Sequence, residues 1–146
     1  LEPNLHTLSP SDFGFHNCLR KADGNLVFLD FEHFGWDDPA KMIVDFLLHP
    51  AMELDQQFKT RFIVNLVAGL DTSGRLSDRI EAVYPLFGLK WCLILLNEFH
   101  SESMRRRRLA APNSGPDSEV QTAQLAKAQI MLKEIQATYR EFPYHD

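Results

Sequence analysis

Three polar residues near the start of the chain have the types and spacing that phosphoryl transfer uses. Asp12 and Asn17 lie five positions apart, and Asp30 follows at the end of a hydrophobic run. Transfer of a phosphoryl group needs little covalent help from a protein, because one acid that orients a hydroxyl and a few oxygen ligands for Mg²⁺ are enough. Asp12 matches the acid, and Asn17 and Asp30 match the oxygen ligands.

The interval between Asp12 and Asn17 gives this pattern its weight. In the catalytic loop of kinases, an Asp base is followed five positions later by an Asn that binds the metal. A lone Asp and Asn at this spacing more often belong to a loop with caps and turns. The ordered set of Asp12, Asn17 and Asp30 therefore favours phosphotransferase ancestry over an accidental loop and hairpin in a helical domain.

The residues between Asn17 and Asp30 predict a β-hairpin. We expect one strand at 17–21 and another at 26–30, joined by a two-residue turn at Asp23-Gly24, where glycine allows positive φ. Such a hairpin returns Asp30 to the side of Asn17. An amide oxygen and a carboxylate oxygen placed together can hold Mg²⁺ against phosphate oxygens and water.

A second interpretation of the same residues is less consistent. Asp12-Phe13-Gly14 spells the Asp-Phe-Gly metal motif of protein kinases. That assignment would require a catalytic Asp with its own Asn earlier in the chain, and the eleven residues before Asp12 hold no such pair. The segment Asp30-Phe31-Glu32 fits the later metal motif better.

From about Leu8 to Pro50 the chain resembles the aminoglycoside phosphotransferase and choline kinase-like family. The catalytic loop of that family usually reads His-Gly-Asp, then four residues, then Asn. The resemblance implies that Asp12 is the catalytic base and that Asn17 and Asp30 bind Mg²⁺ and, with it, ATP. The family also has, later in the chain, a Gly, an Asp-Pro pair and an Asp on a helix. Here these positions are matched by Gly35, Asp38-Pro39 and Asp45.

One position departs from the pattern of that family. The His that stands two residues before the base is replaced by Pro10, within Ser9-Pro10-Ser11-Asp12. Because that His mainly supports the loop, the departure concerns the geometry of the loop more than its chemistry.

Composition bounds the class of protein. The chain has 146 residues, is 45% hydrophobic and carries a net charge of −5, which fits one soluble domain and argues against a general nucleic-acid binder. No uninterrupted apolar run reaches the roughly 18 residues of a membrane span. Cys18 and Cys92 are too few for a disulfide framework or a zinc site. We therefore expect a cytoplasmic protein with reduced thiols and no membrane partner.

The rest of the chain is expected to be helical. Asp38 can cap a helix that begins at Pro39 and stops at His49-Pro50. Residues 84–96 are apolar almost all round and predict the central core helix. Further helices are expected at about 52–70, 76–82 and 118–141. The last of these has an apolar seam for the core or a second chain, formed by Leu125, Ala128, Leu132, Ile135, Tyr139 and Phe142.

The expected fold is mainly α with one small β-hairpin, and by resemblance it is the C-terminal subdomain of the protein kinase-like fold. We expect a single domain, in which residues 1–38 hold the catalytic loop, hairpin and metal-binding loop and residues 39–146 form a helical subdomain. The sequence has no Gly-x-Gly and no recognisable strand Lys paired to a Glu, so the N-terminal nucleotide lobe is expected to be absent. We then expect the chain to be the C-terminal part of a longer enzyme, inactive alone, with an exposed apolar face through which it could form a homodimer.

Charged residues in the second half of the chain favour structural roles. The run from Arg105 to Arg108 fits a solvated helix end better than a nucleic-acid site, which would show a steep salt dependence of binding. Glu98 and Glu102, one helical turn apart, could meet a cationic substrate, although a solvated helix face is the more common role.

Three other residues flank the proposed site. His16 and His33 could assist catalysis, but neither has metal-ligand spacing with another His. Trp36 could line a substrate cleft, although a packed aromatic is more common.

Two functions follow from these residues. The resemblance implies an ATP- and Mg²⁺-dependent phosphotransferase that phosphorylates a hydroxyl group of a small molecule. The alternative is a non-catalytic helical interaction or regulatory module derived from the same fold. A reading frame that continues upstream with a glycine-rich hairpin and a strand Lys would favour the enzyme, whereas one that starts at Leu1 would favour the module.

Overall fold

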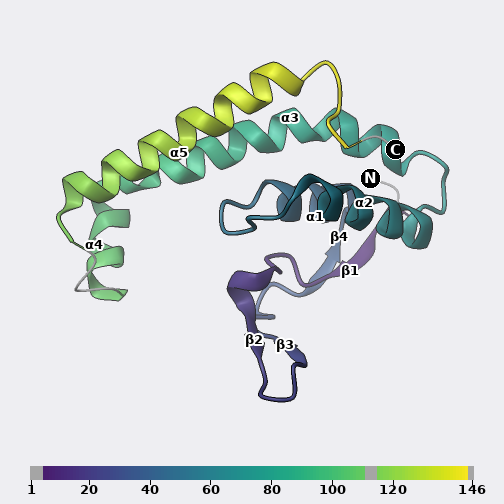
Figure 1. The fold of residues 1–146 in the computed structure, drawn as a ribbon, viewed down its shortest axis with the longest axis horizontal. Coiled ribbons are helices and arrows are strands. Elements are labelled where there is room, and N and C mark those ends of the chain that lie inside the picture. The colour runs from purple at the N-terminus through teal and green to yellow at the C-terminus, as the bar shows by residue number, and fades with distance from the viewer. Residues whose placement is uncertain (1–4, 111–114, 145–146) are drawn as a thin grey trace. The chain divides into compact units, whose positions relative to one another are not determined.

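The computed structural model describes residues 5–110 and 115–144 (Figure 1). About 62% of the chain is helical, with five α-helices and two small antiparallel sheets among the described residues. The chain divides into two compact units, Leu1–Phe87 with Phe142–Asp146, and Gly88–Glu141. The prediction of a mainly helical fold with a β-hairpin is confirmed. The division expected at residue 38 is of another kind, because it separates the catalytic loops from the helical subdomain by function. It stays a prediction.

The expected hairpin consists of β2 (Cys18–Arg20) and β3 (Leu26–Phe28), paired in antiparallel register with Cys18 opposite Phe28. Its connection differs from the predicted two-residue turn. The N–H of Lys21 donates to the carbonyl of Asn25 at 2.8 Å, so three residues form the loop. Gly24 has a φ of +87°, and the carboxylate of Asp23 accepts the Asn25 N–H at 3.0 Å. The Asp side chain thus stabilises the longer loop.

A second sheet was not expected from the sequence. It pairs β1 (Thr7–Ser9) with β4 (Gly35–Asp37), and Ser9 lies opposite Gly35. Each strand has three residues and no clear alternation of apolar and polar side chains, which is too little for a sequence-based prediction. The pairing brings together the two ends of the segment that holds Asp12, Asn17 and Asp30.

Helix α1 (Pro39–Leu48) begins and ends as predicted. The carboxylate of Asp38 accepts the N–H of Ala40 at 2.8 Å, and Pro39 occupies the first turn, where its missing N–H costs nothing. Eight of its ten residues are buried, namely Pro39, Ala40, Met42, Ile43, Val44, Phe46, Leu47 and Leu48. α1 is therefore the centre of the core in its unit.

Helix α2 (Gln56–Leu70) begins four residues later than predicted. Residues 52–55 are not helical, because Met52 turns back toward the end of α1 and donates its N–H to the carbonyl of His49 at 2.9 Å. This turn buries the Met52 side chain. Gly74, with a φ of +68°, marks the expected break after α2.

Helix α3 (Leu76–Leu95) is one continuous helix where two were predicted. Pro85 lies inside it and removes one backbone donor, yet the helix continues on both sides. The prediction of a central core helix at 84–96 is also wrong. Leu86 and Leu93 are 64% and 68% exposed, because the described residues cover only part of the helix circumference.

The second half of the chain holds η3 (Leu96–Phe99), α4 (Ser101–Ala110) and α5 (Asp117–Thr138). The seam predicted on α5 is confirmed only in part: Ala128 and Ile135 are buried, whereas Leu125 and Leu132 are 39% and 37% exposed. Phe142 lies beyond the helix and instead packs edge-on against Tyr84, with ring centroids 5.2 Å apart.

The arginine run lies at the end of α4, where its charges are matched by nearby acids. Arg107 donates to Glu98 at 2.6 Å, and Arg108 pairs with Asp117. The other pairs join Arg105 and Arg106 to Glu102. The arrangement fits the helix-end interpretation, and both glutamates are engaged by arginines.

The segment Leu76–Phe99 contains an 18-residue window with a mean hydropathy of 1.3, so it is long and apolar enough to cross a membrane by length and composition alone. This is weak evidence, because core helices of soluble proteins pass the same test. The expectation of no membrane partner stays a prediction.

Candidate active site

The loop that carries Asp12 leaves β1 through a tight turn. The hydroxyl of the fully buried Ser9 accepts the N–H of Ser11 at 3.0 Å, and the N–H of Asp12 donates to the carbonyl of Pro10 at 2.9 Å. Ser11, at the centre of this turn, has a φ of +65°. Such a conformation is uncommon for a side-chain-bearing residue and persists only where surrounding contacts hold it. Backbone strain therefore precedes Asp12 directly.

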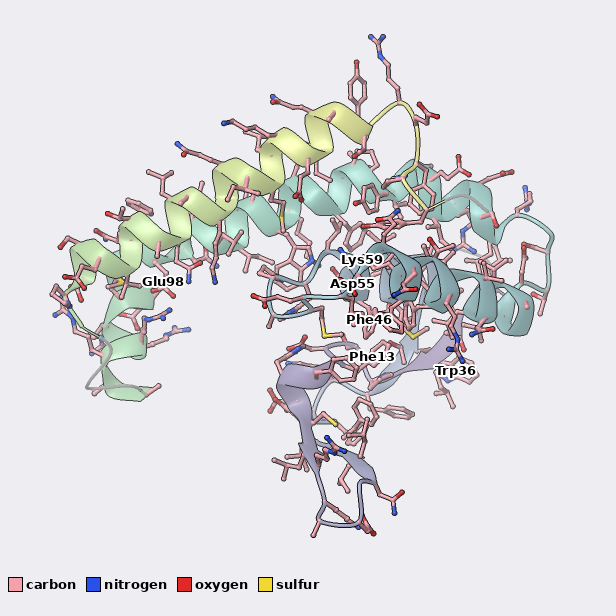
Figure 2. All side chains as sticks on the ribbon, viewed as in Figure 1. Phe13, Trp36, Phe46, Asp55, Lys59 and Glu98 are labelled. Atoms are coloured by element: carbon pink, nitrogen blue, oxygen red, sulfur yellow. The ribbon has the colours of Figure 1, made fainter. Side chains whose placement is uncertain are left out.

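Phe13 anchors the loop to the helical core. Its ring stacks on Phe46 of α1 with centroids 5.1 Å apart (Figure 2). The centroid of the Phe13 ring also lies 6.3 Å from that of Phe62 in α2. The N–H of Phe15 donates to the sulfur of the buried Met52 at 3.2 Å. These contacts, from α1 and α2 to Phe13 and from the turn after α1 to Phe15, fix the loop on both sides of Gly14. The Phe of the apparent Asp-Phe-Gly motif thus serves as a packing anchor.

Asn17 closes the loop onto the backbone of Asp12. Its side-chain Nδ2 donates to the Asp12 carbonyl at 2.9 Å, and its own N–H donates to the Gly14 carbonyl at 3.1 Å within η2 (Phe15–Asn17). Because the amide nitrogen makes this bond, the amide oxygen Oδ1 is left to face a cation. The proposed base and the proposed ligand are therefore connected through one hydrogen bond.

Asp30 follows the second strand of the hairpin, next to a residue bonded to Asn17. The N–H of Leu29 donates to the Asn17 carbonyl at 2.9 Å, which extends the pairing of the two strands up to Asp30. Asp30 is exposed and has a φ of +61°. Among the described residues, Ser11 and Asp30 are the only two with positive φ that are not glycine. Both lie next to the proposed chemistry, where stored strain is commonly found.

Two imidazole rings lie against the carboxylate of Asp12. Nε2 of His16 is 3.1 Å from Asp12 Oδ1, and Nε2 of His49 is 3.9 Å from the same oxygen. The two rings stack with centroids 3.9 Å apart and planes within 1°. Burial and the neighbouring His16 lower the pKa of His49, against the opposite effects of Asp12 and Asp45. His49 is thus favoured in its neutral form.

The sequence-based prediction missed His49. His16 precedes Asn17 directly and was weighed, but His49 lies at the far end of α1, and its only signal was a His-Pro pair that stops a helix. The other two flanking residues make no contact of this kind. The imidazole of His33 lies 3.3 Å from Glu32 at the surface, and Trp36 is 72% exposed.

Three acidic residues just before and within α1, Asp37, Asp38 and Asp45, lie close to basic side chains. Lys41 of α1 pairs with Asp37 and lies 3.8 Å from Asp45, while Arg79 of α3 pairs with Asp38. These pairs fix the segment that follows β4 without using Asn17 or Asp30.

The oxygen donors fit Mg²⁺. Asn17 offers an amide oxygen and Asp30 an exposed carboxylate, and Mg²⁺ prefers a few such ligands completed by phosphate oxygens and water. The site is open at the surface. Two cavities, of about 150 and 360 Å³, lie along α2 and α3 and are lined by neither residue, nor by Asp12. Among the described residues, the proposed base and the proposed metal ligands thus lie outside both of these cavities.

A scan against protein-family models found no matching family, and searches of curated proteins and of solved structures found no match. The resemblance to the aminoglycoside phosphotransferases therefore rests on the sequence pattern alone.

Proposed function

We propose that this chain is the C-terminal catalytic part of an ATP- and Mg²⁺-dependent phosphotransferase, similar to the aminoglycoside phosphotransferases, that phosphorylates a hydroxyl group of a small molecule. One observation carries the proposal. The side chain of Asn17 is bonded to the Asp12 backbone, and the hairpin ends in Asp30 next to a residue bonded to Asn17. A base and two metal ligands are thereby joined in one short segment.

Each side chain has a separate task in this proposal. Asp12 orients the substrate hydroxyl and accepts its proton, while Asn17 and Asp30 hold the metal with their oxygens. Bound Mg²⁺ supplies positive charge that neutralises the phosphate oxygens during transfer. The protein contributes mainly position, so the anchoring of the loop by Phe13 and Met52 matters as much as the acids themselves.

The strained residues favour this function over an accidental loop. A left-handed conformation costs on the order of 1–3 kcal/mol for a residue other than glycine. Ser11 and Asp30 both adopt it, although glycine would remove the strain at either position. Two such residues beside one set of polar side chains support a catalytic origin for the segment.

Metal binding by the chain itself is the first test. Mn²⁺ can replace Mg²⁺ as a paramagnetic probe, and we expect it to broaden the amide NMR signals around residues 17 and 30 first. Asp30→Ala should weaken this effect about tenfold or more, whereas Asp23→Ala, at the opposite end of the hairpin, should not change it. Broadening centred elsewhere, or unaffected by Asp30→Ala, would contradict the metal assignment.

Turnover in the complete gene product is the second test. Asp12→Ala and Asp12→Asn should lower kcat by about 10²-fold or more while nucleotide binding is largely retained. Asp30→Ala should instead weaken the binding of Mg²⁺ and ATP. Retained turnover in both Asp12 variants would contradict the assignment. The set of hydroxyl compounds that stimulates ATP consumption would then identify the substrate.

A non-catalytic interaction module is the second candidate, because many apolar side chains of α3 and α5 are exposed. Leu93 is 68% and Ile130 is 59% exposed. A homodimer formed through such a surface would show a concentration-dependent mass in light scattering, and Leu93→Asp should abolish it. A monomer at high concentration would contradict the dimer. A cytoplasmic location and the lack of nucleic-acid partners stay predictions.

A further inference from the structure

We propose that His16 and His49 are positioning residues for the base: His16 donates an N–H to Asp12, and His49 holds the His16 ring from the end of α1. The proposal rests on the proposed phosphotransferase function. It adds two residues to the site that neither the spacing of the acids nor the resemblance assigned.

The contact between His16 and Asp12 has the distance of a hydrogen bond. An ionised carboxylate can only accept, so Nε2 of His16, 3.1 Å from Asp12 Oδ1, carries the proton. Both imidazoles approach Oδ1. The second oxygen, Oδ2, is then the one that receives the proton of the substrate hydroxyl. His16 thus determines which carboxylate oxygen of Asp12 is left to meet the substrate hydroxyl.

The tautomer of His49 is set by a backbone group. The N–H of Ala51 donates to Nδ1 of His49 at 3.1 Å, so this nitrogen carries no proton. In the neutral ring the proton therefore sits on Nε2, the atom that lies 3.9 Å from Asp12 Oδ1. This distance is too long for a hydrogen bond. His49 acts by stacking on His16 and by placing a weakly positive N–H near the carboxylate.

Gly14 provides independent support for a built site. Its φ of 167° is accessible to any residue, so no backbone strain demands glycine here. A Cβ at this position would instead lie 2.8 Å from Nδ1 and Cε1 of the His16 ring and 2.8 Å from the sulfur of Met52. Glycine therefore leaves the space that the imidazole and the Met52 sulfur occupy together. The loop is shaped around the ring as well as around the acid.

The same loop lacks the His that the resemblance leads one to expect before the base, since Pro10 stands there. Support for Asp12 comes from the following side instead, through His16 in the loop and His49 after α1. This offers a physical reason why the replacement by Pro10 is compatible with a positioned base.

A metal bound by Asp12, His16 and His49 is the competing explanation, because their ligand atoms lie within 4.8 Å of one another. Two features disfavour it. The ring planes are parallel within 1°, so the in-plane nitrogen lone pairs cannot converge on one ion without rotation of a ring. In His49 the N–H of Ala51 also occupies Nδ1 and places the ring proton on Nε2, so this proton would have to leave before Nε2 could bind a metal.

The first experiment observes the imidazoles directly in the unmodified chain. Long-range ¹H–¹⁵N NMR spectra distinguish the two neutral tautomers, and we expect His49 to be protonated at Nε2 and not at Nδ1. The carboxyl ¹³C signal of Asp12 should shift in His16→Phe and stay unchanged in His100→Phe, a control in the other unit. A His49 ring protonated at Nδ1, or an unshifted Asp12 signal, would overturn the proposal.

The second experiment measures kcat and KM in the complete gene product. His16→Phe should lower kcat about 10- to 100-fold with little change in KM for ATP, because a misplaced base slows transfer without loosening the nucleotide. His16→Gln, which keeps an N–H donor, should restore part of kcat, and His49→Phe, which keeps the stacked ring, should lose less than His49→Ala.

The outcomes separate this proposal from the function on which it rests. If Asp12→Asn is inactive and His16→Phe is as active as the parent, only the positioning role is wrong. If Asp12→Asn retains turnover, the phosphotransferase assignment itself fails. A variant that does not fold, judged by its circular dichroism, is replaced by His16→Gln, whose NMR spectrum and kcat still decide the question.

Discussion

Helices α1 and α5 use their residues in opposite ways. α1 has ten residues, of which eight are buried, whereas α5 has twenty-two residues, of which only Ala128 and Ile135 are buried. Burial of apolar side chains is the main source of helix stability in a protein, so the short helix is the better anchored of the two.

This difference indicates which helix is better anchored by its contacts. α1 supports the proposed site, because Phe46 stacks on Phe13 of the loop and His49 follows its last turn. α5 is held at narrow points, such as the contact of Ile135 with Gly88 and the Cys92 thiol, whose Sγ donates to the Ala128 carbonyl at 3.6 Å. Several of its other apolar side chains, among them Leu125 and Ile130, are exposed within the described residues.

Matched isoleucines give the largest expected contrast between the two helices. Ile43 of α1 is fully buried, and Ile130 of α5 is 59% exposed. Ile43→Ala should lower the free energy of unfolding by about 2–5 kcal/mol because it leaves a cavity, and Ile130→Ala by less than about 0.5 kcal/mol. Urea denaturation followed by circular dichroism measures both. Equal losses would show that α1 is no stronger an anchor than α5.

The contact between Ile135 of α5 and Gly88 of α3 can be tested by adding a methyl group at Gly88. A Cβ at Gly88 would lie 2.3 Å from Cδ1 of Ile135, so Gly88→Ala should destabilise by about 1–3 kcal/mol even though alanine favours a helix. Ile135→Ala removes the clashing atoms. In the double variant, Gly88→Ala should therefore cause no further loss, as a thermal-denaturation cycle would show. Additive losses would contradict the contact.

The starts of the two helices provide a smaller contrast. Asp38 caps α1 with its carboxylate and pairs with Arg79, so Asp38→Ala should lower the free energy of unfolding by about 1–2 kcal/mol. Asp38→Asn keeps the cap and should lose less. α5 begins after Pro116, which makes no side-chain cap, and Pro116→Ala should change stability by less than about 0.5 kcal/mol. Denaturant midpoints compare the three variants.

The smallest effect is expected in the pH dependence of stability. Because the pKa of His49 is lower in the folded state, the unfolded chain binds the proton first as the pH falls. Stability from this group is present above the ordinary imidazole value of about 6.5 and declines below it until the folded pKa is passed. Denaturation at several pH values should show a weaker decline in His49→Gln. If stability declines with pH equally in His49→Gln and in the parent chain, His49 is not the source of the decline.

Local signals explain which parts of the fold were predictable. Asp38-Pro39 predicts the start of a helix because the Asp38 side chain caps the N–H of a residue only two positions later. Asp23-Gly24 predicts a hairpin because the turn depends on these neighbouring residues alone. The exact length of that hairpin loop was not predictable, because the hydrogen bond of Asp23 with Asn25 shifts it by one residue. The length of α3 was missed for a related reason, since Pro85 weakens a helix without ending it.

Within the candidate site, the sequence by itself determined the types and order of Asp12, Asn17 and Asp30, because these depend only on spacing and on the hairpin between them. Only the tertiary structure decided that His49 stacks on His16 and that apolar residues of α3 such as Leu93 are exposed among the described residues. Contacts between distant segments depend on how helices pack, and packing is a property of the whole fold that no local pattern encodes.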